Sequence, residues 1–388
     1  MFLFNPDNDL ALANFSYNYT PPASILKLGG DLSMLPLWYS PDCSIIAVQS
    51  NTDLEYVEYI KSIFEIGSVV MNIAEINKYE LKNIVPWGWN PMLCKKLEEL
   101  GVEKQLLPSL SELERLRNYS SRKNSVSLLC DLKREISTFC GESFYFTDIE
   151  KLLHYLSSTE GDKALKMPLS GSGRGLIWIL DGITDKQTDW AKRVIRNQGG
   201  IVAEPKLKRV QDFAMEFSLS GGKISFEGYS LFNTADSGAY VGNVLMSDRD
   251  IEAFLSEYIS VDILWGLRDL LTEKLVDYFP LYNGILGVDM MVCDTDDGYK
   301  LQPCVEVNMR MNMGMLSHIF YNRFVKSGVK GSYTVEYFKK AGDALAFHQE
   351  NLKRYPLVVE KNKIVSGYLS LSSVVEDTHY IAYANIDK

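Results

Sequence analysis

The chain has 388 residues, 46% of them apolar and 12% aromatic, which is enough for two or three domains with buried cores. Its formal net charge of −10 argues against nucleic acid as a bulk partner. No apolar run approaches the roughly 18 residues of a membrane-spanning helix, so no membrane partner is expected. The first residues, MFLFNPDNDL, show no basic leader, and a cytoplasmic location is the default expectation.

Cysteine and histidine usage makes disulfides and a zinc site unexpected. The six cysteines form no C-x-x-C pair, and the four histidines have no ligand-like spacing. In an acidic protein without such a site, an anionic ligand has to be held by a few well-placed cations.

The first hundred residues alternate short strands with helices. Strand patterns occur at residues 2–4, 45–49 and 69–72, and a helical pattern covers 54–64. This alternation is typical of a parallel α/β unit. Residues 91–100 are expected to form a helix that ends at Gly101.

Residues 110–137 have charged and leucine positions at helical spacing, and strand patterns dominate from residue 164 onward. Between the strands, helical patterns cover 185–197 and 248–278, and a further helix is expected at 334–352. The strand patterns are LKMPL, LIWIL, IVAEP, FAMEFSL, KISFEGYSL, GILGVDMMV, LQPCVEVNM, IVSGYLSL and YIAYANI. No internal repeat is present. Three segments are expected: 1–115, 116–200 and 201–388.

The stretch PCVEVNMRMNMG, residues 303–314, places three polar groups at alternate positions. In a β-strand, Glu306, Asn308 and Arg310 share one face. If Asp297-Gly298 is a two-residue hairpin turn, Asp289 lies directly opposite Glu306. Two facing carboxylates and an amide oxygen suit Mg²⁺. The alternatives are that Asp289 pairs with a lysine, or that a bulge near Pro303 shifts the register.

The stretch ALKMPLSGSGRGLIWIL, residues 164–180, predicts two strands around a glycine-rich loop. Amide N–H groups of such a loop can line a phosphate, with Lys166 and Arg174 as nearby cations. The loop is not a P-loop, because the glycines follow the lysine. The alternative is a turn without a ligand.

Together these motifs, over roughly residues 110–320, resemble the ATP-grasp family. The resemblance implies an α/β chain with α+β elements, an ATP-grasp fold and an N-terminal parallel α/β domain of the pre-ATP-grasp type at 1–115. Segment 116–200 would then be the small subdomain with the glycine-rich loop. Segment 201–388 would be the large subdomain with the metal site and a C-terminal extension.

The resemblance also implies roles for individual residues. Lys166 would contact the α and β phosphates, and Arg310 would face the transferred phosphate. Asp289, Glu306 and Asn308 would be the magnesium ligands, and Asp212 would lie near the ribose. The glycine loop over the γ-phosphate comprises Ser170, Gly171, Ser172, Gly173, Arg174 and Gly175, and the hinge whose backbone reads adenine comprises Glu204, Pro205, Lys206 and Leu207.

The sequence departs from the family pattern at two positions. Where the family usually has a further phosphate lysine, this chain offers Arg122, with Lys123 as the alternative. An arginine is a planar, bidentate cation and not a point charge like lysine. Two residues before the first magnesium aspartate, many members have an arginine where this chain has Gly287.

The implied function is an ATP-dependent ligase that joins a small carboxylate to an amine through an acyl phosphate. ATP and Mg²⁺ are the implied cofactors, with two ions expected and Mn²⁺ as an alternative. A phosphotransferase of the same fold and a non-catalytic ATP-binding sensor are the other hypotheses. The oligomeric state stays open, a homodimer included.

Two further stretches have alternative interpretations. The loop FNPDNDLALANFSYNYTPP, from residue 4 to 22, is either a substrate wall at the end of the first strand or a turn that leads into a helix. The aromatic stretch PWGWN, residues 86–90, is either an aromatic shelf for a ligand or a site of packing between domains, and packing is expected.

Overall fold

The computed structural model describes residues 1–49, 54–171, 175–234 and 240–387. The chain divides into two compact units. Unit 1 comprises Met1–Glu114, Val241–Asp248 and Arg310–Lys388, and unit 2 comprises Arg115–Tyr240 and Arg249–Met309. The three subdomain segments expected from the sequence remain a prediction.

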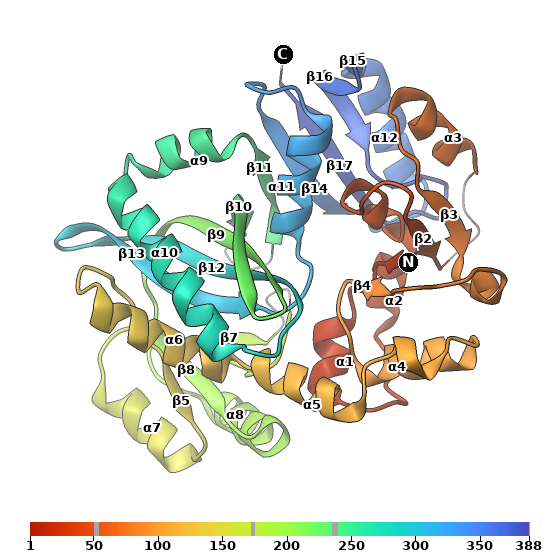
Figure 1. The fold of residues 1–388 in the computed structure, drawn as a ribbon. Coiled ribbons are helices and arrows are strands. Elements are labelled where there is room, and N and C mark those ends of the chain that lie inside the picture. The colour runs from red at the N-terminus through yellow and green to blue at the C-terminus, as the bar shows by residue number, and fades with distance from the viewer. Residues whose placement is uncertain (50–53, 172–174, 235–239, 388) are drawn as a thin grey trace. The chain divides into compact units, whose positions relative to one another are not determined.

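A four-stranded parallel sheet forms the N-terminal part of unit 1, as the sequence predicts (Figure 1). Each neighbouring pair is parallel, with Phe2 opposite Ile46 and Val85. The strand order is β3 (Val69–Asn72), β2 (Ile45–Val48), β1 (Phe2–Leu3) and β4 (Val85–Pro86). The accompanying helices are α1 (Asn8–Asn14), α2 (Ala23–Asp31), α3 (Leu54–Ile63) and α4 (Pro91–Glu99), with short 3-10 turns at Leu35–Trp38, Ile73–Lys78 and Lys104–Leu106.

Helix α4 has the boundaries that its end signals predict. Asn90 accepts a hydrogen bond from the Leu93 amide at 2.9 Å, and Pro91 takes the first helical position. Beyond the helix, Gly101 has a φ of +89°, a conformation that glycine adopts without strain.

Unit 1 also contains an antiparallel set of strands. In order, these are β11 (Tyr240–Leu245), β14 (Gly331–Tyr337), β17 (Tyr380–Ile386), β16 (Lys363–Ser370) and β15 (Val358–Glu360). The expectation of a helix over 334–352 is wrong at its start, because 334–337 belong to β14 and only α12 (Asp343–Arg354) is helical. Strands on both sides supply hydrogen bonds to β14, which overrides the local helical pattern. Helix α11 (Met313–Phe324) was not predicted.

The aromatic core of unit 1 surrounds Trp38, which is fully buried. Its ring makes edge contacts with Phe64, Phe320 and Phe324, and its indole N–H donates to the Leu371 carbonyl at 2.7 Å. Trp87 of the PWGWN stretch is also buried, against Phe4 and Tyr39, so it packs within unit 1, while packing between domains stays a prediction.

Unit 2 contains a four-stranded antiparallel sheet. Its order is β5 (Phe144–Phe146), β8 (Ile201–Pro205), β6 (Lys163–Lys166) and β7 (Leu176–Ile179). The neighbouring helices α7 (Ile149–Ser158) and α8 (Asp185–Gln198) pack on it (Figure 1). Leu152, Leu165 and Val194 belong to the core between them.

A second antiparallel set in unit 2 has the order β13 (Gly298–Asn308), β12 (Gly284–Thr295), β9 (Lys208–Ser220) and β10 (Lys223–Thr234). Two expected helical regions are each divided in the structure. Residues 110–137 form α5 (Leu110–Tyr119) and α6 (Arg122–Glu135), because Ser121 caps a new helix. Residues 248–278 form α9 (Asp248–Leu255) and α10 (Val261–Tyr278).

In the described part of the chain, we find no helix with the length and apolar character that crossing a bilayer requires.

Candidate active site

The facing carboxylates of the β12-β13 hairpin occur as predicted, although the turn differs from the expected one. Asp289 lies opposite Glu306, but Thr295 pairs with Gly298, so the tip of the hairpin is Asp296-Asp297 and not Asp297-Gly298. Gly298 has a φ of +95°, whereas Asp297 does not have a positive φ. The tip is therefore a two-residue turn, Asp296-Asp297, followed by a glycine in the left-handed conformation.

An irregularity between Asp289 and Met291 restores the expected pairing. Met291 lies opposite Gln302, so the segment that contains Pro303 has two more residues than the facing part of β12. Proline has no N–H for the ladder and is tolerated at such a bulge. The alternative bulge near Pro303 thus exists, and it brings Asp289 and Glu306 together.

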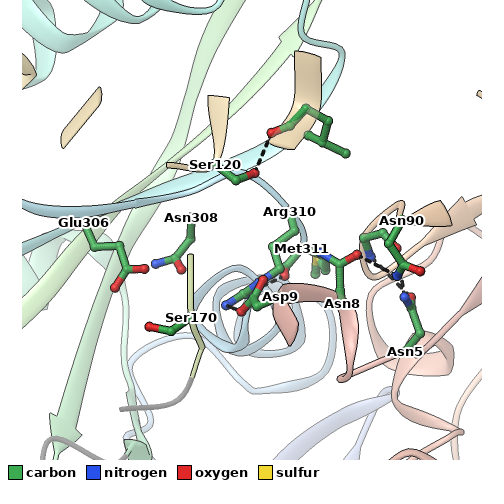
Figure 2. A network of polar contacts seen from close by, with 12 residues as sticks. Asn5, Asn8, Asp9, Asn90, Ser120, Ser170, Glu306, Asn308, Arg310 and Met311 are labelled. Carbon is green, nitrogen blue, oxygen red and sulfur yellow. Dashed lines mark hydrogen bonds and ion pairs between the residues drawn. The ribbon is translucent and has the colours of Figure 1, made fainter. Parts of the chain in front are cut away.

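Asn308 completes the candidate metal set on the same hairpin. Its Nδ2 donates to Asp289 Oδ2 at 3.0 Å, and its side chain points to the same region as that of Glu306 (Figure 2). Arg310 does not continue this alternation, because β13 ends at Asn308. Gly287 lies opposite Asn308 and beside Glu216 of β9, a buried carboxylate that the sequence analysis did not select.

Arg122 connects the metal set to the start of the glycine loop. Its Nη2 donates to Glu306 Oε2 at 2.6 Å, and its Nη1 donates to Ser170 Oγ and to the Met167 carbonyl, each at 2.7 Å. The residue is 8% exposed, and its Nε is buried without a hydrogen-bond partner. Lys123 is exposed and lies 5.8 Å from the centre of the Tyr145 ring. The structure therefore brings Arg122, and not Lys123, together with Glu306 and Ser170.

Lys166 on β6 has an ion-pair partner on the neighbouring strand β8. Its Nζ donates to Glu204 Oε2 at 2.5 Å, and both side chains are nearly buried, at 12% and 10% exposed. Ser143, which the sequence analysis did not select, donates to the other Glu204 oxygen at 2.9 Å. A periodic pattern in one strand cannot reveal this partner, because Glu204 is on the neighbouring strand β8.

The remaining hinge candidates lie at and beyond the end of β8. Pro205 is the last residue of that strand, and Leu207 precedes β9. Lys206 is largely exposed and forms an ion pair with Asp162 at 3.2 Å.

Asp212 on β9 is a partly buried acid. Burial raises the pKa of its carboxyl above the usual value of 3.8, while hydrogen bonding from Thr234 and the charge of Arg209 act in the opposite direction. The Thr234 hydroxyl donates to Asp212 Oδ2 at 2.7 Å.

The two ends of the glycine loop are tied together. The Met167 amide donates to the Gly175 carbonyl at 2.8 Å. A Cβ on Gly175 would lie 2.3 Å from Ser170 Oγ, so this close approach requires glycine. Gly171 follows Ser170 within the described residues. Ser172, Gly173 and Arg174, expected in the same loop, lie outside the described residues.

In unit 1, buried amides gather beyond the carboxyl ends of β1 and β4. Asn5 bonds to the backbone of Gly88 through both of its polar atoms, and Asn90 donates to Asn8 Oδ1 at 3.1 Å (Figure 2). In open parallel sheets, ligands bind beyond these strand ends where the strand order reverses. The predicted helix after this turn is confirmed as α1, and the substrate-wall interpretation stays a prediction.

Asp7 of the same stretch is 7% exposed, and its Oδ2 has no hydrogen-bond partner. Burial raises the pKa of this carboxyl, with its own backbone and Lys96 lowering the pKa and Asp9 raising it further. Ionisation of the Asp7 carboxyl in the folded protein therefore lowers the free energy of unfolding, because the charge is buried without a hydrogen-bond partner at Oδ2.

We expect Asp7→Asn to stabilise the protein at neutral pH by on the order of 1 kcal/mol. Because the folded pKa is raised, the cost of the wild-type carboxylate is absent below the unfolded pKa of about 3.8. That cost grows as the pH rises above the unfolded pKa and is complete once the pH exceeds the raised folded pKa. Urea unfolding at several pH values should show a gain that shrinks on acidification. Asp377→Asn, at an exposed site, is the control; an equal gain at all pH values would contradict the prediction.

Comparison with known proteins identifies the fold. No protein-family model matches the chain, and no curated protein sequence matches it. Biotin carboxylase from Campylobacter jejuni, solved as a beta-gamma-ATP complex, has a similar structure with 12% identity and a TM-score of 0.51. The likeness covers 100% of this chain and 87% of that one.

Two other solved structures are similar at lower scores. Carboxyaminoimidazole ribonucleotide synthase from Aspergillus clavatus, complexed with ATP, has 10% identity and a TM-score of 0.48. L-amino acid ligase from Bacillus licheniformis has 12% identity and a TM-score of 0.45. Each likeness covers 89% of this chain and 94% of the other. The fold of this chain is that of the ATP-grasp enzymes.

Proposed function

We propose that the chain is an ATP- and Mg²⁺-dependent ligase that joins a small carboxylate to an amine through an acyl phosphate. The observation that carries the proposal is the constellation at the β12-β13 hairpin. There Asp289 faces Glu306, Asn308 bonds to Asp289, and Arg122 links Glu306 to Ser170. A protein that binds ATP without catalysing a reaction does not need facing carboxylates beside a loop that would bind phosphate.

The donor set fits a hard divalent cation. Facing carboxylates on adjacent strands repel each other unless a cation lies between them, and Glu306 already attracts the guanidinium of Arg122. Asp289, Glu306 and Asn308 would hold Mg²⁺, which would neutralise charge on the phosphate oxygens. Among the described residues, no three His, Cys, Asp or Glu side chains gather as a metal site, so an amide is needed to complete this one. A second ion and Mn²⁺ are finer parts of the proposal.

The chain's own cations supply the phosphate contacts. Lys166 and Arg122 would bind phosphate oxygens, with backbone amides of the glycine loop beside them. Both cations form ion pairs with carboxylates, at 2.5 Å for Lys166 with Glu204 and 2.6 Å for Arg122 with Glu306. Phosphates therefore compete with these carboxylates. Arg122 would bind phosphate in place of Glu306, and Glu306 is one of the residues that would hold the cation, so nucleotide and metal should each strengthen the binding of the other.

In the proposed reaction, no side chain of the protein needs to form a covalent bond with the substrate. The substrate carboxylate attacks the γ-phosphate and releases ADP, and the amine then displaces phosphate from the acyl phosphate. The residues of the site align the reactants and neutralise charge as the phosphoryl group moves. Three parts of the proposal rest on the family resemblance alone: Arg310 and Arg174 at the transferred phosphate, adenine binding at 204–207, and ribose binding by Asp212. A cytoplasmic location, with its supply of ATP, belongs to the same proposal.

The test is turnover with pooled substrates. Incubated with ATP, Mg²⁺ and a panel of small carboxylates, the protein should release ADP only when a carboxylate is present. Added hydroxylamine should trap the acyl phosphate as a hydroxamate, and a suitable amine should give an amide. Boiled protein and omission of Mg²⁺ are the controls.

The outcomes separate the competing functions. A stable phosphorylated product that hydroxylamine does not intercept would indicate a phosphotransferase. Tight ATP binding without turnover across the whole panel would indicate a sensor, a hypothesis that Gly287 favours because an arginine is common there in the family.

A further inference from the structure

The guanidinium of Arg310 has a bidentate partner far away in the sequence. Arg310 Nε donates to Asp9 Oδ1 at 2.7 Å, and Nη2 donates to Asp9 Oδ2 at 2.8 Å (Figure 2). A third N–H group, on Nη1, donates to the Met311 carbonyl at 3.1 Å. The side chains are 16% exposed for Arg310 and 24% exposed for Asp9.

The backbone next to Arg310 is held as firmly as its side chain. The Met311 amide donates to the Trp87 carbonyl at 3.0 Å, at the end of β4. Asn312 accepts from the Met315 amide at 2.8 Å and so caps α11. Asp9 itself lies in the first turn of α1, where the helix dipole favours a carboxylate. The anchors of Arg310 and of its neighbouring backbone therefore lie in α1, just beyond β4 and just before α11, all within unit 1.

The pair of Arg310 with Asp9 determines the orientation of the guanidinium as well as the presence of its charge. A side-on bidentate pair fixes both the position and the plane of a guanidinium, which a single hydrogen bond does not. An unheld arginine side chain has many rotamers, and catalysis by charge neutralisation depends on placing the charge beforehand.

We infer that Asp9 is the positioning residue for Arg310: within unit 1 its carboxylate keeps the guanidinium in one position and one plane, ready for the contact with the transferred phosphoryl group that the proposed function gives to Arg310. The inference rests on the proposed function, and it gives the FNPDND stretch a role that the sequence analysis left open. Asp9 touches no reactant in this role. It acts through Arg310.

The test compares Asp9→Asn with Asp9→Glu. The amide of Asn has one acceptor oxygen and an NH2 donor, so it cannot accept from Nε and Nη2 through two separate oxygens as Asp9 does, and kcat for ADP release should fall roughly ten- to a hundredfold. The KM for ATP should stay within about threefold of the wild type, because nucleotide binding itself is left to other residues. Glu retains the carboxylate and should recover part of the loss. Asp42→Asn is the matched control, since Asp42 pairs with Arg323 in the same unit at 2.9 Å.

A second measurement separates positioning from stability and does not need a known substrate. ADP with aluminium fluoride imitates the phosphoryl group in transfer, and calorimetry gives its affinity relative to ADP alone. Asp9→Asn and Arg310→Lys should each reduce the extra affinity given by the fluoride complex, and the double variant should lose little more than either single variant.

The results distinguish this inference from the proposed function. If the wild type binds the fluoride complex more tightly than ADP but never turns over, the ligase proposal fails and the calorimetry still decides the role of Asp9. Unchanged kcat and unchanged fluoride affinity in Asp9→Asn would overturn the inference. So would equal additive losses in the double variant, which would mean that Asp9 and Arg310 act independently.

Discussion

Glu306→Gln is expected to lower Mg²⁺-dependent ADP release by at least about a hundredfold, because it removes a charged oxygen ligand from the candidate metal set. The substitution also leaves the Arg122 guanidinium, 10% exposed, without its carboxylate. Breaking a buried pair from one side costs up to about 3–5 kcal/mol, so the variant should unfold at lower urea concentration than the wild type.

A double variant separates these two effects. Arg122→Gln combined with Glu306→Gln removes both charges and should restore much of the stability, while turnover stays lost. Glu135→Gln is the control for a carboxylate in the same unit, because Glu135 is 53% exposed and pairs with Lys274. Turnover of Glu306→Gln within threefold of wild type would rule out Glu306 as a metal ligand.

Lys166→Ala is expected to weaken ATP binding by roughly ten- to a hundredfold, the usual worth of a charge-assisted phosphate contact. In this variant the nearly buried Glu204 carboxylate loses its lysine partner. It keeps only the hydrogen bond from the Ser143 hydroxyl, at 2.9 Å. A loss of stability should therefore accompany the loss of affinity.

The comparison with Lys166→Met, Glu204→Gln distinguishes the two losses. Removing both charges should return the unfolding midpoint toward that of the wild type, but titration calorimetry should still show weak ATP binding. Lys274→Ala, at an exposed ion pair of the same unit, should change neither quantity. Wild-type affinity in the double variant would mean that Lys166 serves only to neutralise Glu204.

Local patterns predicted much of the fold. Alternation of strands with helices led to the parallel sheet, and the end signals of α4 led to its boundaries. These features depend on neighbouring residues, on apolar spacing and on caps, so they are visible in the sequence. The strand β14 was missed because its hydrogen bonds come from β11 and β17, which are remote in the chain.

The facing pair of Asp289 and Glu306 shows a limit of such reasoning. The pairing is confirmed, yet the expected turn at Asp297-Gly298 is wrong, and an irregular segment at Pro303 compensates for the shift. The hairpin register depends on the whole ladder, including its contacts with β9, and not on the turn residues alone.

By itself, the sequence determined which residue types stand at which positions of each strand and loop, and hence the prediction of a magnesium donor set and of a phosphate-binding loop, in that family order. Only the tertiary structure decided how the candidate cations are paired. Lys166 meets Glu204 across 38 positions, Arg122 meets Glu306 across 184, and Arg310 meets Asp9 across 301. The physical reason is that a nearly buried charge needs a counter-charge, and packing of distant elements selects which carboxylate comes within reach.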